Sequence, residues 1–259
     1  MQELTFKKKV SKGSRFNQIY VPKHLENEIS AGDEVEVRLI RKKTELYYSK
    51  SAKKLSVFKE NLIKGVFASL KEFKEVSKIF LIGSFLLEKI DFRDIDIILV
   101  AKKETKGLSE KAYNKLINKF NLKFHVISIS EQKLSHLLSI CPVTRSMFST
   151  YISNKEFVVD KNTSIDKKHL QFLLMLPEDA LELDLSSRMF YDSLRRLIVV
   201  ERFLENKPFG FNIVKSELIK SIGQKLHEKI KNSMSVSEKS IAVLRQEIMS
   251  KLAVINGMI

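Results

Sequence analysis

Two acidic residues lie in an apolar stretch of the chain, where carboxylates are costly to bury. The stretch is DIDIILV, residues 94–100, in which Asp94 and Asp96 alternate with isoleucines. Residues two apart in a β-strand point the same way, so both carboxylates would project from one face of a sheet. Two such carboxylates repel each other unless a proton or a cation lies between them, and oxygen ligands suit Mg²⁺ or Mn²⁺. We therefore predict that Asp94 and Asp96 are metal ligands.

A Gly-Ser pair ends the preceding apolar run. This pair, Gly83 and Ser84, follows KIFLI, residues 78–82. Glycine permits a close approach of the backbone, and serine offers a hydroxyl and an N–H group that suit phosphate oxygens at a helix start. Arg93, beside the acids, either neutralises phosphate charge or is an exposed cation that tempers them. The pattern predicts a phosphate group at Gly83 and Ser84, next to the metal.

These residues resemble the signature of the DNA polymerase β-like nucleotidyltransferase superfamily, a hydrophobic-Gly-Ser followed after a short spacer by Asp-hydrophobic-Asp-hydrophobic. Here it reads Ile82-Gly83-Ser84 and then Asp94-Ile95-Asp96-Ile97. The resemblance covers residues 50–162 and implies a nucleotidyltransferase-fold mixed sheet with helices. It also implies Mg²⁺ (or Mn²⁺) and an NTP as substrate, with Gly83, Ser84 and Arg93 as the nucleotide-binding residues. The NMP of this NTP would pass to a hydroxyl of RNA, protein or a small molecule.

One position departs from that family. A third carboxylate usually lies on a later strand, and the corresponding segment here, residues 123–130, has His125 in its place. Imidazole is a poor ligand for Mg²⁺ compared with oxygen. His125 is then a general base for the attacking hydroxyl, or the site binds nucleotide and turns over slowly or not at all. A third reading is a sheet histidine with a purely structural hydrogen bond.

The N-terminal 45 residues carry a cluster of basic side chains between short strand-like segments. We expect strands over residues 18–22 and at Val35, Val37 and Leu39, with a short helix from Lys23 to Glu28 between them. The basic residues are Lys7, Lys8, Lys9, Lys12 and Arg15. They would meet DNA phosphates in a salt-sensitive interaction, or form a solvated strand edge that discourages aggregation.

This segment resembles the SpoVT-AbrB/MazE swapped-hairpin DNA-binding family. The positions that carry the resemblance are Gly13, Ile19, Val21, Pro22, Gly32, Asp33, Val35 and Val37. It implies a small all-β domain over residues 1–45 that binds DNA as a homodimer. A unit of this length has too little core to fold alone, so pairing with a second copy is the expected remedy.

The rest of the chain predicts an α/β domain over residues 50–162 and a helical bundle over residues 165–259. Apolar residues at helical spacing alternate with strands at 78–82, 94–100 and 123–130, and KEFVV, residues 155–159, is expected as a late strand. Pro142 should end the helix before it. From residue 165 only helical periodicity is present, including a helix after a serine N-cap near residue 237.

The composition of the chain indicates which class of partner it binds. The net charge of +15 favours polyanions such as nucleic acid or nucleotides. The single cysteine, Cys141, allows no internal disulfide, and no apolar stretch reaches the ~18 residues that a membrane span needs. We therefore expect a cytoplasmic protein, and the resemblance described above implies that it is an enzyme, a nucleotidyltransferase. The alternative is an antitoxin-like, DNA-binding regulator that has a degenerate, weakly catalytic nucleotidyltransferase domain.

Overall fold

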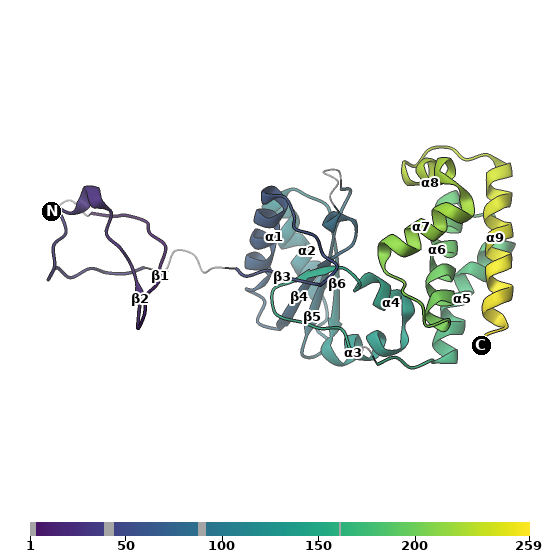
Figure 1. Ribbon diagram of the computed structural model, residues 1–259, viewed down its shortest axis with the longest axis horizontal. Coiled ribbons are helices and arrows are strands. Elements are labelled where there is room, and N and C mark those ends of the chain that lie inside the picture. The colour runs from purple at the N-terminus through teal and green to yellow at the C-terminus, as the bar shows by residue number, and fades with distance from the viewer. Residues whose placement is uncertain (1–3, 39–43, 88–91, 161) are drawn as a thin grey trace. The chain divides into compact units, whose positions relative to one another are not determined.

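The chain divides into two compact units, residues 1–43 and 44–259, and each is described by itself. The computed structural model describes residues 4–38, 44–87, 92–160 and 162–259 (Figure 1). The α/β region and the helical region that the sequence predicts as separate domains both belong to the second unit.

The N-terminal unit has little regular structure. Strands β1 (Ser11–Lys12) and β2 (Asn17–Gln18) pair antiparallel around a tight turn, and a single 3₁₀ turn, η1, spans Lys23–Leu25. Leu25 is the one buried apolar side chain among the unit's described residues, whereas Val35 and Val37 are 62% and 66% exposed.

The strand predicted over residues 18–22 is therefore wrong beyond Gln18, and so is the strand at Val35 and Val37. Leu39 lies outside the described residues. The predicted helix at Lys23 to Glu28 is a shorter 3₁₀ turn. An alternating apolar segment becomes a strand only where a neighbour supplies hydrogen bonds and an apolar surface. The described residues of this chain supply neither to residues 35–37.

The second unit is built on a mixed five-stranded sheet with the strand order β3-β7-β4-β5-β6. Its strands are β3 (Tyr47–Tyr48), β4 (Val76–Ile82), β5 (Ile95–Ala101), β6 (Phe124–Ser130) and β7 (Tyr151–Ser153). Only β5 and β6 are parallel; the other neighbours in the sheet are antiparallel. The strands predicted at 78–82, 94–100 and 123–130 are confirmed, except that Asp94 and Lys123 directly precede β5 and β6 and do not belong to them. Each strand is an apolar run that the sheet buries on one face or on both.

Nine α-helices occur in the described part of the chain, all in this unit. They are α1 (Val57–Leu70), α2 (Leu108–Phe120), α3 (Glu131–Ile140), α4 (Pro142–Met147), α5 (Lys167–Glu182), α6 (Ser187–Leu204), α7 (Phe211–Ile222), α8 (Gln224–Lys231) and α9 (Glu238–Asn256). The predicted serine N-cap is Ser237, whose hydroxyl accepts a hydrogen bond from the backbone N–H of Ser240. None of the described helices is both long and apolar enough to cross a membrane.

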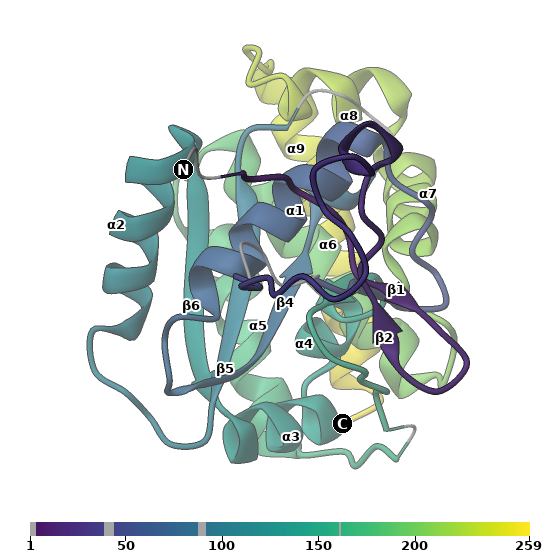
Figure 2. The same ribbon diagram turned by 90° about the vertical axis from the view of Figure 1, so that its left-hand side faces the viewer.

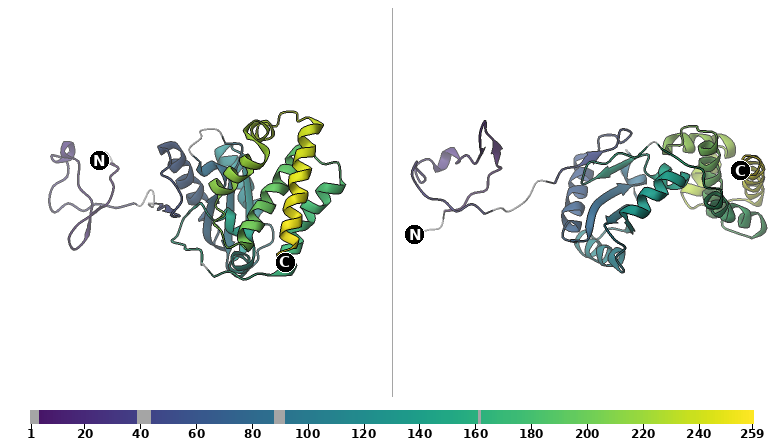
Figure 3. Two further views of the ribbon diagram at one scale, coloured as in Figure 1. Left: turned by 45° about the vertical axis from the view of Figure 1, so that its right-hand side comes forward. Right: turned by 90° about the horizontal axis from the view of Figure 1, so that it is seen from below.

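Helices cover both faces of the sheet. One core lies between the sheet and α1 and α2, which Figure 2 shows in front of the strands. A second, smaller core packs α3 and Phe148 against Phe80, Ile98 and Val100 on the opposite face. A third lies among α5 to α9, where α6 packs against both α5 and α9 (Figure 3). The strand alternation of β5 places Asp96 on the face of Ile98 and Val100.

Two local expectations differ from the structure. The late strand is β7 at Tyr151–Ser153 and not KEFVV, because Tyr151 and Ile152 are buried beside β4 whereas Val158 is 79% exposed. Pro142 does end α3, but it also begins α4 as its first residue, with Cys141 as the N-cap. Proline is favoured at the first position of a helix because a backbone N–H at that position has no acceptor within the helix, so proline loses no hydrogen bond there.

Candidate functional site

Three strand ends meet at one edge of the sheet. Because β4 and β5 are antiparallel while β5 and β6 are parallel, the carboxyl end of β4 lies beside the amino ends of the other two. Asp96 pairs with Ile82 on one side and with His125 on the other. The chain thus brings the Gly83-Ser84 turn, Asp96 and His125 side by side, although up to 42 positions separate them in the sequence.

Gly83 allows the turn to approach the carboxylate. Its φ is +80°, a backbone conformation that side chains rarely adopt. A Cβ atom built on Gly83 would lie 2.2 Å from Oδ2 of Asp96, far inside van der Waals contact. Only glycine fits at this position while the Asp96 carboxylate keeps its place. Ser84, which begins the 3₁₀ turn η2 (Ser84–Leu86), is exposed beside it.

Asp96 also contacts His125. The Oδ1 atom of Asp96 lies 3.2 Å from Nδ1 of His125, and the two side chains are 30% and 65% exposed. With Asp96 ionised, Nδ1–H donates to the carboxylate, so Nε2 carries the imidazole lone pair. The contact favours the neutral tautomer in which Nε2 is the hydrogen-bond acceptor of the ring.

Burial dominates the electrostatics of Asp96. Removal from water raises the pKa of its carboxyl, the hydrogen bond from His125 lowers that pKa, and the negative charge of Asp94 raises it. The net direction is upward. The charge of Asp94 therefore acts on Asp96, and burial outweighs the stabilisation that His125 gives to the ionised form of this carboxyl.

A cation that the sequence did not single out also acts here. The charge of Arg195, an exposed residue of α6, lowers the pKa of Asp96. Arg93, which the sequence predicts as a phosphate contact, is exposed and is not among the charges that act on Asp96 in the described part of the chain. The helical periodicity around Arg195 predicts which residues of the helix are buried. It does not predict which acidic residue an exposed arginine of that helix will lie near.

The donor set suits a Mg²⁺ ion that arrives with a nucleotide. Within the described ranges, no group of three or more His, Cys, Asp or Glu residues could hold a metal ion. Mg²⁺ commonly binds through one or two carboxylates together with substrate phosphates and water, so Asp94 and Asp96 fit that mode. The close approach of Gly83 to the Asp96 carboxylate is the structural observation in favour.

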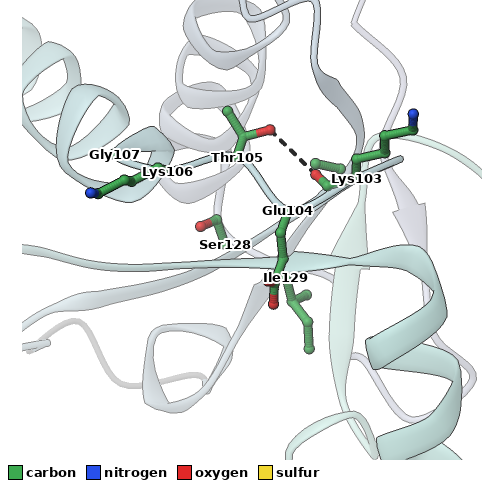
Figure 4. A pocket seen from close by; sticks show the side chains of 8 residues that line it. Lys103, Glu104, Thr105, Lys106, Gly107, Ser128 and Ile129 are labelled. Carbon is green, nitrogen blue, oxygen red and sulfur yellow. Dashed lines mark hydrogen bonds between the residues drawn. The ribbon is translucent and has the colours of Figure 1, made fainter.

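A described pocket lies at the opposite end of β5 (Figure 4). Lys103, Thr105 and Lys106 line it, together with Ser128 of β6. Glu104 is another lining residue, and its carboxylate lies 3.4 Å from Nζ of Lys133. Because the pocket adjoins Ala101, at the carboxyl end of β5, it does not belong to the site at Asp96.

The predicted DNA contacts lie in the N-terminal unit. Lys7, Lys8, Lys9, Lys12 and Arg15 are all exposed, with Lys12 in β1 and Arg15 in the turn that follows. The chain matches no protein-family model, and no curated protein matches it by sequence.

Proposed function

We propose that residues 44–259 form a Mg²⁺-dependent nucleotidyltransferase that moves an NMP from an NTP to a hydroxyl of RNA, protein or a small molecule. The observation that carries this proposal is the approach of Gly83 to Asp96, where a Cβ atom would lie 2.2 Å from the carboxylate. Packing alone does not require a turn this close to a partly buried acid. A site that binds a phosphate group at the turn and a metal ion at the acid does require it, because the metal ion must also bind oxygens of that phosphate.

Each residue then has a distinct role. Asp94 and Asp96 would hold the metal ion, which when bound supplies Lewis-acid polarisation of the phosphate oxygens. Ser84 would donate to the triphosphate, and Arg195 would offset its negative charge from α6. The resemblance to nucleotidyltransferases gives the class of reaction. A cytoplasmic location belongs to the proposal, and the buried free thiol of Cys141 is compatible with a reducing compartment.

In this proposal His125 acts as the general base. Its Nδ1 is committed to Asp96, so Nε2 can accept the proton of the attacking hydroxyl. We expect His125→Asn to lower kcat by roughly 10²-fold, a typical loss for a general base, with little change in the KM for NTP. Steady-state kinetics check this. An unchanged kcat would show that His125 has only a structural role. A kcat of His125→Asp above that of the wild type would show that catalysis needs a third carboxylate at this position.

Incubation with α-labelled NTPs and Mg²⁺ or Mn²⁺ tests the function itself. Wild-type protein should release pyrophosphate and transfer label to an acceptor, and the Asp94→Ala/Asp96→Ala variant should do neither. Equal traces from both proteins would defeat the proposal. A panel of RNA, protein and small-molecule acceptors then identifies the class of hydroxyl.

The N-terminal unit favours a second function, DNA binding as a homodimer. Its described residues bury only Leu25, while Phe16, Val35 and Val37 are 62–78% exposed. Such a chain gains a core only by pairing its apolar segments with another surface, and a second copy offers the same segments. In this second reading the protein is an antitoxin-like regulator, and residues 44–259 serve as a weakly catalytic nucleotide-binding part.

Salt dependence tests the DNA-binding function. Replacement of Lys7, Lys8, Lys9, Lys12 and Arg15 by Gln should weaken binding to duplex DNA. The slope of log K against log salt should become shallower by about 0.9 for each phosphate that the protein no longer neutralises. Fluorescence anisotropy at several salt concentrations measures both quantities. Binding that keeps its slope in the substituted protein would place the DNA-binding surface elsewhere.

A further inference from the structure

A lysine of α1 is buried below the Gly83-Ser84 turn. Lys59 is 4% exposed, and its Nζ donates hydrogen bonds to the carbonyl oxygens of Phe85 and Leu87, each at 2.7 Å. The same Nζ lies 4.9 Å from the centroid of the Phe85 ring. The ammonium group therefore holds the segment that directly follows Ser84 by two backbone contacts and one ring contact.

An ammonium is a costly group to bury in a core that methionine could fill. Burial lowers the pKa of Lys59, which is the expected direction for a cation taken from water. Two charge-assisted hydrogen bonds offset part of that cost, and they are stronger and more directional than packing alone. The two hydrogen bonds restrict the backbone of Phe85 and Leu87 to the orientation in which both carbonyl groups face the ammonium group.

The Phe85 ring also contacts a residue next to the acidic part of the site. The Phe85 ring packs edge-on against Phe92, with 4.8 Å between centroids. Phe92 directly precedes Arg93 and Asp94. One buried cation and one aromatic pair thus connect the Gly83-Ser84 turn to the start of the acidic strand.

We propose that Lys59 is a positioning residue for the triphosphate of the NTP: it fixes the Gly83-Ser84 turn against Asp96 and, through Phe85 and Phe92, the approach of Asp94. This inference rests on the proposed function of the same site. In this role Lys59 acts through the backbone of the turn.

The test replaces Lys59 by methionine, which keeps the length of the side chain and removes its charge and its donors. We expect Lys59→Met to raise the KM for NTP by about 10–100-fold, the usual range when the support of a ligand-binding group is removed. Lys59→Arg, which keeps a cation and donors, should show a smaller rise. Lys64→Met is the matched control, because Lys64 lies on the same helix and pairs with Glu60, at 3.6 Å, on a more exposed part of it.

Hydrogen exchange without nucleotide gives a readout that does not depend on catalysis. In Lys59→Met, and to a lesser degree in Lys59→Arg, amides of residues 83–87 should exchange faster while those of β6 keep their protection. Uniformly faster exchange, or a KM equal to that of the Lys64→Met control, would overturn the inference and leave Lys59 as a packing residue. A wild-type protein that does not turn over NTP would defeat the proposed function instead, and the exchange result would still decide whether Lys59 holds the turn.

Discussion

Asp96→Asn is expected to lower nucleotidyl transfer by roughly 10³-fold and to raise the melting temperature of the nucleotide-free protein. The loss follows from removing a metal ligand, which is worth several kcal/mol of transition-state stabilisation. The gain in stability follows from the raised pKa of Asp96, since ionising this partly buried carboxyl beside Asp94 works against folding at neutral pH. Few substitutions at a merely structural acid would move activity and stability in opposite directions.

The raised pKa of Asp96 also determines how the stability difference between the wild type and Asp96→Asn depends on pH. A carboxyl whose pKa is higher in the folded state binds its proton more tightly there, so the wild type loses stability as the pH rises through that pKa. The advantage of Asp96→Asn should therefore be largest at neutral pH and shrink in acid. Thermal unfolding at several pH values measures it, with the exposed Asp184→Asn as a control for the loss of one negative charge. A lower melting temperature for Asp96→Asn at neutral pH would contradict the electrostatic description of the site.

Gly83→Ala should lower transfer activity by about 10²-fold or more. The new methyl group would lie 2.2 Å from Oδ2 of Asp96, so either the turn or the carboxylate must move, and shifts of about 1 Å in a site of this kind have effects of that size. The positive φ of +80° adds a backbone strain of about 1–3 kcal/mol to the free energy of folding. Kinetics and thermal unfolding on the same preparation separate the two effects.

Gly223→Ala provides the matched control. Gly223 has a φ of +83° but open space around the site of a Cβ atom. Alanine there should cost a similar backbone strain and leave transfer unchanged. If Gly83→Ala and Gly223→Ala lowered activity equally, the loss would reflect stability, and the approach of Gly83 to Asp96 would have no special part in function.

The site was predictable where local pattern and chemistry coincide. Alternation along residues 94–100 identifies the acidic strand, and Gly-Ser at the end of an apolar run identifies the turn. The neighbour of Asp96 was predictable as well, since His125 occupies the place of a third carboxylate on the next strand. Arg195 and Lys59 were not, because their roles arise from which surfaces α6 and α1 present to the sheet, and helical periodicity reports only which residues are buried.

Strand pairing explains the other differences between the strands that the sequence predicts and those that the structure contains. Tyr47–Tyr48 joins the sheet as β3 by pairing with β7, a contact between segments about a hundred positions apart that no local pattern marks. Residues 35–37 have the alternation of a strand, yet this chain offers them no partner among its described residues. Their sequence pattern is complete only if another surface, such as a second copy, supplies the missing neighbour.

Binding of Mn²⁺ by electron paramagnetic resonance, with and without a non-hydrolysable NTP analogue, tests most directly whether Asp94 and Asp96 hold a divalent ion together with a triphosphate. We predict weak Mn²⁺ binding to the free protein, tight binding when the analogue is present, and no such gain in Asp94→Ala/Asp96→Ala. Identical Mn²⁺ titrations of the wild type and the double variant in the presence of the analogue would contradict the proposed site.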